Sequence, residues 1–492
     1  MTETAKKKRG MPSSFTILLA LLAIVAVITV IVSGTSGGAV TAARLSDFCT
    51  APIKGFADAL PVCLFVMILG GFLGMMTETG ALDNGIAALV QKLKGNEIML
   101  IPVLMLIFSL GGTTYGMCEE TVPFYALLAA TMMAAGFDPM VGAATVLLGA
   151  GCGCLGSTVN PFAVGAAVDA LTGVDIAVNQ SIIIGLGAVL WIVTTAMSIV
   201  FVMNYAKKVK ADKGSTILSM QELKAAEEAH GKAASEVHKE VKLTGRQKGV
   251  LIAFAFTFVV MIVGFIPLAD LNEGVANFFD AGAVYDADGN AVVQGWSALI
   301  TGLPIGQWYF DEASTWFFLM AILIGIIGGL SEKQIVNTFI TGAADMMSVV
   351  LVIALARGIS VLMANTGLDV YVLDAAANAL AGLSGVIFAP MSFLVYFGLS
   401  FLIPSTSGMA TVSMPIMGPL AVKLGFSPEV MVMIFSAAIG VVNLFTPTSG
   451  AIMGGLALAK IEWTTWLKFA LKLIVALSVV CAIILTVACV LL

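Results

Sequence analysis

Long runs of apolar residues, separated by short polar stretches, recur along the whole chain. Each run is near the length of about 20 residues that crosses a bilayer as an α-helix. The alternation of apolar and polar residues that is typical of membrane-spanning strands is not seen in the sequence. The pattern therefore predicts an all-α polytopic membrane protein, with transmembrane helices over residues 15–33, 60–76, 140–171, 181–205, 249–268, 314–330, 347–363, 428–458 and 466–490.

Four apolar stretches are interrupted by motifs rich in Gly, Pro, Ser and Thr. They are the re-entrant hairpins predicted over 97–133 and 386–420, with tips at 111–116 and 404–408, and the broken helices predicted over 140–171 and 428–458, interrupted at 157–161 and 446–450. Such motifs can simply kink packed helices. Their symmetric placement instead favours irregular backbone that lines a cavity, where it is tolerated at membrane depth.

The two halves of the chain resemble each other at a nearly constant offset. The motif at residues 55–58 (Gly-Phe-Ala-Asp) has a counterpart at 342–345 (Gly-Ala-Ala-Asp), 287 positions further on. Another pair, Gly-Phe-Asp-Pro ending at Pro139 and Gly-Phe-Ser-Pro ending at Pro428, is 289 positions apart. Several matches in one order indicate an internal repeat, and repeats with paired broken helices are typical of secondary transporters.

The repeat divides the chain into successive segments. We predict a cytoplasmic N-terminus (1–14), a first membrane repeat (15–205), a cytoplasmic, solvated helical linker (206–248), a linking transmembrane helix (249–268), an external loop (269–313) and a second membrane repeat (314–492). The first repeat crosses the membrane an even number of times, so it begins and ends on the same side. The one linking helix then crosses once, so the second repeat begins on the opposite side and is upside down relative to the first. The sequence thus predicts two inverted-topology repeats, each with a hairpin and a broken helix.

Composition and charge agree with this plan and orient it. Hydrophobic residues make up 59% of the chain, charged residues only 11%, and the mean hydropathy is +1.03. Lys and Arg gather before residue 10 and in the 206–248 linker, whereas 269–312 carries Asp and Glu but neither Lys nor Arg. The positive-inside rule then puts the N-terminus and the linker in the cytoplasm of a bacterial inner-membrane protein. The first apolar run is long enough to span, so we do not interpret it as a cleaved signal peptide.

Three charged residues fall within apolar stretches. Glu119 and Glu120 follow the first hairpin tip, and Arg357 lies in the middle of a predicted helix. Charge at membrane depth is costly and usually marks function. The alternatives are a helix start that favours a carboxylate, and a structural ion pair for Arg357. In the functional interpretation, Arg357 neutralises a solute carboxylate, and either glutamate faces an amino or guanidino group or carries a coupling proton.

Hydroxyl and amide side chains concentrate at the four interruptions. We expect them to bind the solute together with the charged residues, although Ser and Thr also bond their own backbone or join helices. The candidates are Thr113, Thr114, Ser157, Thr158, Asn160, Ser405, Thr406, Ser407, Thr446, Thr448 and Ser449. Ser157, Asn160, Thr448 and Ser449 are the candidates for a Na⁺ site, because unwound carbonyls beside them can hold a coupling cation. The alternative coupling ion is H⁺.

The first-half motifs carry a specific resemblance. Gly-Gly-Thr-Thr-Tyr-Gly-Met-Cys-Glu-Glu-Thr-Val-Pro-Phe (111–124) and Leu-Gly-Ser-Thr-Val-Asn-Pro-Phe (155–162) resemble the YfcC-like family, which belongs with the four-carbon-dicarboxylate anaerobic carriers and basic amino-acid antiporters of the ion-transporter superfamily. The resemblance covers nearly the whole chain. It implies a homodimeric elevator transporter with a scaffold and a transport domain. The dicarboxylate branch has Ser-Asn-Thr at its hairpin tips, whereas the tips here read Gly-Thr-Thr and Ser-Thr-Ser.

We therefore predict a secondary transporter of a small organic solute, either an amino acid, in particular a basic one, or a related carboxylate. A four-carbon dicarboxylate carrier is the alternative, and an ion channel belongs to another class. An intramembrane hydrolase would use Ser384 in Gly-Leu-Ser-Gly (382–385) as its nucleophile. Such a serine needs a base within hydrogen-bond reach, but both histidines lie in the linker, away from the membrane interior. No nucleotide-binding motif is present. We expect no enzyme activity, cofactor or nucleic-acid partner, only a solute, lipid and a second copy of the chain.

Overall fold

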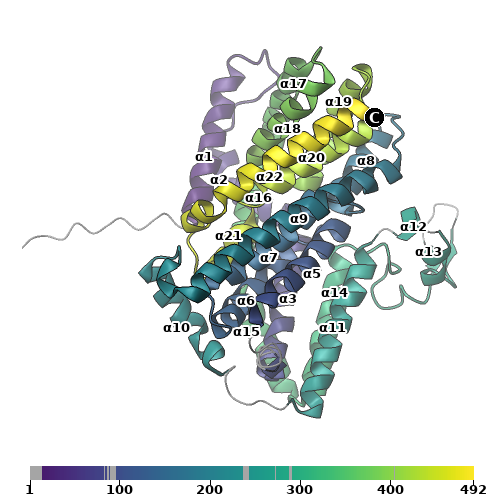
Figure 1. Ribbon diagram of the computed structural model, residues 1–492. Coiled ribbons are helices and arrows are strands. Elements are labelled where there is room, and N and C mark those ends of the chain that lie inside the picture. Colours follow the sequence, from purple (N-terminus) through teal and green to yellow (C-terminus); the bar gives the residue numbers. More distant parts are fainter. Residues whose placement is uncertain are drawn as a thin grey trace, which may run out of the picture.

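The computed structural model confirms the all-α membrane fold (Figure 1). It describes residues 14–81, 84–85, 88, 96–236, 243–266, 268–271, 273–286, 291–403 and 405–492. The strands found in this part of the chain are β1 (Val284–Tyr285) and β2 (Ala291–Val293), which pair antiparallel. Residues 287–290, between the two strands, lie outside the described residues.

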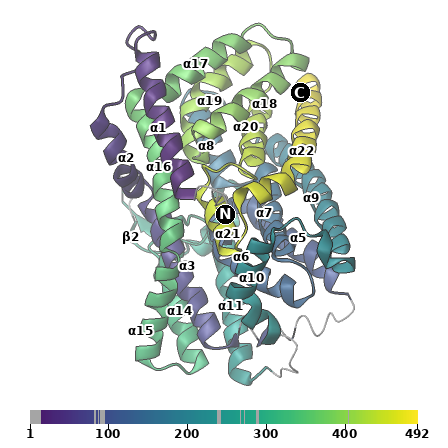
Figure 2. The ribbon, with the colours of Figure 1, turned by 90° about the vertical axis from the view of Figure 1, so that its left-hand side faces the viewer.

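A first helix group packs around the long helices α3 and α16 (Figure 2). Its members are α1 (Ser14–Ser33), α2 (Leu45–Asp58), α3 (Leu60–Glu78), α11 (Gly245–Phe265), α14 (Phe310–Gly328), α15 (Glu332–Asp345) and α16 (Met347–Thr366). Helix α2 packs on α16, and α15 packs on α3. Aromatic rings join α3, α11 and α14, with ring centroids 4.9–6.1 Å apart in the contacting pairs. These rings belong to Phe72, Phe254, Phe258 and Phe317.

A second helix group contains the interrupted stretches. Its members are η1 (Glu97–Met99), α5 (Leu100–Tyr115), η2 (Glu119–Thr121), α6 (Val122–Ala134), α7 (Pro139–Leu155), the π-helical turn η3 (Pro161–Gly165), α8 (Ala166–Thr172), α9 (Gln180–Ala211), α18 (Gly385–Leu402), α19 (Thr406–Lys423), α20 (Pro428–Val442), α21 (Gly450–Leu458) and α22 (Trp463–Leu491). Helix α7 packs on α5, α6, α9 and α20, and α20 packs on α18, α19 and α22.

Helices α7 and α20 begin in the same way at the centre of this group. The side chain of Asp138 accepts a hydrogen bond from the Val141 amide, and that of Ser427 accepts one from the Val430 amide. A proline follows each cap at the first helical position, where no amide hydrogen is needed. Both helices are buried along almost their whole length, which explains why their sequences are apolar on every face.

The remaining elements connect the two groups or lie outside them. They are η4 (Lys213–Ser215), α10 (Met220–Glu236), α12 (Leu268–Leu271), α13 (Glu273–Phe279) and α17 (Leu368–Leu380). Helix α10 lies in the predicted linker but is not fully solvated, since Glu222 is 4% exposed and Ala226 is fully buried. It packs on α6. Lys224, Glu227 and Glu228 are exposed, whereas Glu222 and His230 are buried.

Eight helices of the described chain are long and apolar enough to cross a membrane. One of them, Glu97–Tyr115, is the first arm of a stretch that we predicted to be a re-entrant hairpin. Length and composition alone do not separate these two possibilities. The shorter apolar helices include α7 and α20, the first halves of the predicted broken helices. The inverted orientation of the two repeats stays a prediction.

Candidate functional site

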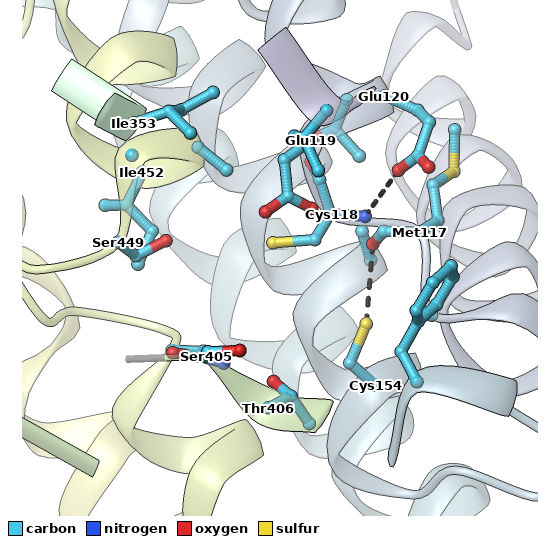
Figure 3. Close-up of a pocket in the computed structure, with 18 of the residues that line it drawn as sticks. Met117, Cys118, Glu119, Glu120, Cys154, Ile353, Ser405, Thr406, Ser449 and Ile452 are labelled. Carbon is cyan, nitrogen blue, oxygen red and sulfur yellow. Dashed lines mark hydrogen bonds between the residues drawn. The ribbon is translucent and has the colours of Figure 1, made fainter. Parts of the chain in front are cut away.

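The four interruptions meet around one cavity of about 340 Å³ between the two helix groups. The first group contributes the end of α2, the start of α3 and the middle of α16. The second group contributes the turn around η2, the starts of α19 and α21, and the breaks after α7 and α20. Figure 3 shows Glu119 and Ser405 on opposite sides of this space. The volume suits a small organic solute.

The first hairpin turn lies later than predicted. Residues 111–115 continue helix α5, and the chain turns at Gly116, whose φ of +81° is left-handed. A Cβ at Gly116 would lie 2.5 Å from Asn160 Oδ1, so only glycine fits. Gly116 is the last residue of the predicted tip at 111–116, and the prediction was wrong for 111–115, where Gly112 serves close packing instead. A Cβ there would lie 2.2 Å from the Ala150 carbonyl oxygen of α7.

The break after α7 is fastened to the end of α5 through Thr113. Its hydroxyl donates to the Gly156 carbonyl at 2.6 Å, and its carbonyl accepts from the Thr158 amide at 2.9 Å. The Asn160 carboxamide oxygen accepts from the Phe162 amide at 2.9 Å, while its nitrogen donates to Ser157 Oγ at 2.9 Å. These side chains satisfy backbone groups that the broken helix leaves without a partner.

The second half closes the opposite wall with hydroxyl groups. Ser405 caps α19 by accepting from the Gly408 amide at 3.1 Å. The hydroxyls of Thr446 and Thr448 are 2.7 Å apart at the break before α21. Ser436 of α20 also lines the cavity, and its buried hydroxyl has no hydrogen-bond partner among the described residues. A polar group of a solute, or a water molecule, can therefore form a hydrogen bond with the Ser436 hydroxyl.

The two adjacent glutamates point in different directions (Figure 3). Glu120 is 2% exposed and turns back so that its carboxylate accepts from the Cys118 amide at 2.9 Å. Glu119 is partly exposed and faces the cavity. The turn of η2 thus uses one carboxylate to close itself and presents the other to the cavity.

Arg357 forms an ion pair with Asp58, which is one of the two alternatives that the sequence left open. Its Nε donates to Asp58 Oδ2, and both side chains line the cavity. Sequence reasoning missed Asp58 as a site residue. The available signal was its place in the repeated motif at 55–58, directly before an apolar run.

The cavity brings most of the predicted site residues together. Those that line it are Glu119, Glu120, Asn160, Arg357, Ser405, Thr406, Ser407, Thr448 and Ser449. Thr113, Thr114, Ser157, Thr158 and Thr446 do not line it. Thr114 instead bonds the Leu110 carbonyl of its own helix at 2.7 Å. Asp58, Ser436 and Asn443 line it without having been predicted.

The four side chains predicted to form a Na⁺ site do not all face the cavity. Thr448, Ser449 and Asn160 line the cavity, whereas the Ser157 hydroxyl donates to the Cys154 carbonyl at 2.6 Å. Among the described residues, no group of three His, Cys, Asp or Glu side chains is placed to hold a metal ion. A coupling Na⁺ would therefore depend on hydroxyl and carbonyl oxygens, which are ligands that hard cations accept.

Comparison with known proteins gives consistent matches along the chain. The C4-dicarboxylate anaerobic carrier family matches residues 42–490. An uncharacterized protein of Haemophilus influenzae is 29% identical over 443 residues, which are 90% of this chain and 78% of that protein. The putative basic amino acid antiporter YfcC of Escherichia coli is 27% identical over 440 residues, which are 87% of this chain and 77% of that protein.

Two solved transporter structures are similar over nearly the full chain. MtrF of Neisseria gonorrhoeae, described as one of a class of antimetabolite efflux pumps, is 17% identical with a TM-score of 0.43, covering 98% of this chain and 96% of its own. The YdaH transporter of Alcanivorax borkumensis is 15% identical with a TM-score of 0.45, covering 97% of this chain and 98% of its own.

Proposed function

Because the chain is a membrane transporter that belongs to the C4-dicarboxylate anaerobic carrier family, we propose that its cavity binds an amino acid with a cationic side chain. Transport is ion-coupled or by exchange. By the same family resemblance, the carrier works as a homodimeric elevator in the bacterial inner membrane. The first helix group would then be the scaffold, and the second would carry the solute.

The balance of charge in the cavity is the observation that supports this solute class. Three acidic residues line it, Asp58, Glu119 and Glu120, and of the two adjacent glutamates Glu119 turns its carboxylate to the cavity. Arg357 is the only basic side chain among the described lining residues, and it is already paired with Asp58. Two carboxylates next to each other in a site of low dielectric favour a cation that neutralises them. A cationic ammonium or guanidinium group meets that requirement.

The family description favours a different solute, a four-carbon dicarboxylate. Such a solute would bring two more negative charges to a cavity that already holds an excess of carboxylates. It would need a proton or a cation to enter with it. The relative from Escherichia coli carries the name of a putative basic amino acid antiporter, which agrees with the charge argument.

A binding experiment on the purified full-length protein separates the two solutes. Thermal-shift titrations with arginine, lysine, alanine and succinate, each with and without Na⁺, measure which solute stabilises the protein. We expect stabilisation by arginine or lysine and none by succinate. Stabilisation by succinate without any effect of the basic amino acids would overturn the proposal in favour of a dicarboxylate carrier.

A further inference from the structure

The ion pair between Asp58 and Arg357 forms where helices α2 and α16 cross very closely. A Cβ at Gly55 would lie 2.3 Å from the Ala354 carbonyl oxygen, and one at Gly358 would lie 2.7 Å from the Ala51 carbonyl oxygen. Backbone therefore touches backbone, one turn before Asp58 and one residue after Arg357. This crossing fixes the helix positions without help from longer side chains.

The same crossing is built a second time, between α15 and α3. A Cβ at Gly342 would lie 2.4 Å from the Gly70 carbonyl oxygen. The residues of the two crossings correspond at an offset of 287, since Gly55, Asp58 and Gly70 match Gly342, Asp345 and Arg357. The Sγ of Cys63 lies 3.9 Å from the Val350 carbonyl, again between positions 287 apart.

The second crossing lacks the arginine. Gly70 stands where the first crossing has Arg357, and Asp345 is exposed, with no ion pair among the described residues. One crossing therefore packs closely without the pair that the other contains. Arg357 and its partner also lie on the cavity wall, whereas Asp345 and Gly70 do not. The packing of the helices thus does not account for the pair.

The contact with Asp58 leaves the two terminal nitrogens of the Arg357 guanidinium available for another partner. The bond to Asp58 uses Nε, at the side of the guanidinium group. A guanidinium has five N–H donors, and four of them are on its two terminal nitrogens. Two parallel terminal N–H groups match the two oxygens of a carboxylate. Arg357 is 31% exposed, at the cavity wall that faces the turn of η2.

We propose that Asp58 is a positioning residue, which holds Arg357 by Nε so that its terminal edge receives the carboxylate of the solute. This subsite rests on the proposed function and makes it more specific, because Glu119 would bind the cationic end of the same solute. The cavity would then select for molecules that carry both a carboxylate and a cation. Decarboxylated diamines or guanidines of the same length would lack the group that Arg357 recognises.

The test compares each basic amino acid with its decarboxylated counterpart. Affinities of arginine and agmatine, and of lysine and cadaverine, are measured on the purified full-length protein. A charge-assisted bidentate contact should make the wild-type protein bind the amino acids about 10- to 100-fold more tightly. In Asp58→Ala, which removes the acceptor of Arg357 Nε, this ratio should fall toward one, and Asp58→Glu should retain part of it. Arg357→Lys should also lose the ratio, since an ammonium lacks the planar fork.

Asp345→Ala is the matched control, because it removes the corresponding carboxylate at the crossing without the arginine. The ratio should remain at its wild-type value there, and thermal unfolding shows that each variant is folded. Equal binding of arginine and agmatine by the wild type, or an unchanged ratio in Asp58→Ala, would overturn the subsite while the proposed function stands. Failure of all four cationic compounds to bind would overturn both.

Discussion

At the scale of single residues, neighbours in the sequence have different tasks at the turn of η2. The Glu120 carboxylate accepts from the Cys118 amide, so it closes the turn. The Glu119 carboxylate faces the cavity instead (Figure 3). Consecutive residues of a helical turn point in directions about 100° apart, so only one of two adjacent carboxylates can face a solute fully.

This division predicts unequal effects of two conservative substitutions. Glu119→Gln should weaken binding of arginine about 10- to 100-fold, because a charged hydrogen bond to the solute is lost. Glu120→Gln should be mild, because the glutamine oxygen still accepts from the Cys118 amide. Binding titrations with arginine, alanine and succinate measure both effects. Unchanged affinity for every bound solute in both variants would remove the glutamates from the site.

Glu119 and Arg357 were predictable as site residues from the sequence, whereas Asp58 and Ser436 were not. Glu119 and Arg357 are conspicuous because charge is rare within apolar runs. Asp58 follows a stretch that already contains Asp47 and Lys54, so its charge does not stand out. Ser436 lies in an uninterrupted apolar run. Only the fold shows that both line the cavity, because that depends on which helices pack side by side.

At the scale of elements, helix α10 joins parts of the molecule that are far apart in the sequence. It packs on α6, and its Glu222 accepts from the Glu462 amide at 2.9 Å. His230 Nε2 is 3.1 Å from the Leu458 carbonyl oxygen at the end of α21. A carbonyl can only accept, so this ring nitrogen carries a hydrogen. The linker helix is therefore tied to both halves of the second helix group.

Acid should loosen this attachment. Burial, and secondarily the charge of Lys460, lower the pKa of His230 below its ordinary value of 6.5, although its bond to Leu458 opposes the shift. A detached α10 would then bind a proton more readily than the packed one. The attachment is at full strength above about pH 6.5 and weakens as the pH falls through the lowered pKa.

Hydrogen exchange of residues 220–231 measures this effect. After correction for intrinsic rates, exchange should be faster at pH 5.5 than at pH 7.5 in the wild type. His230→Gln should reduce the difference. His238→Gln should keep it, and both variants retain the other charged groups at this junction, Glu222, Lys460 and Glu462. Equal pH dependence in His230→Gln and the wild type would contradict the assignment to His230.

Apolar runs predict long helices better than they predict short or partly polar ones. The run over 60–76 is helix Leu60–Glu78, and the run over 347–363 is Met347–Thr366. Helices α2 and α15 were not predicted, because polar residues divide their apolar positions. Glycine was ambiguous as well. At residue 112 it allows close packing on α7, whereas at 116 it makes the turn.

At the scale of the whole molecule, the distribution of Lys and Arg predicts the orientation, but it cannot show how the helices group. Two packed groups with a cavity between them depend on contacts between residues hundreds of positions apart. The sequence did indicate that the four interruptions would meet, because they fall at matching places in the repeat. The family resemblance implied a scaffold and a transport domain, and this division stays a prediction.

Cysteine labelling in intact cells tests the orientation. After replacement of the exposed Cys49, a Lys224→Cys variant should react with an impermeant thiol reagent only once the cells are broken. A Val292→Cys variant should react in intact cells, since it lies in the acidic segment that we place outside. Both positions are well exposed, with 79% of the Lys224 side chain and 67% of Val292 accessible. Labelling of Lys224→Cys in intact cells would overturn the predicted topology.

The presence of the ion pair at only one of the two glycine crossings has a consequence for the resting carrier. If the two repeats are inverted, as we predict, a pseudo-two-fold rotation relates the inward-open state to the outward-open state, and the two states would have equal energy if the repeats were identical. Asp58 and Arg357 break that degeneracy, because Gly70 replaces the arginine in the other copy. An empty carrier of this kind spends unequal times facing the two sides of the membrane. Its half-saturating solute concentration would then differ between the two faces, and the pair would favour transport in one direction when the solute is scarce.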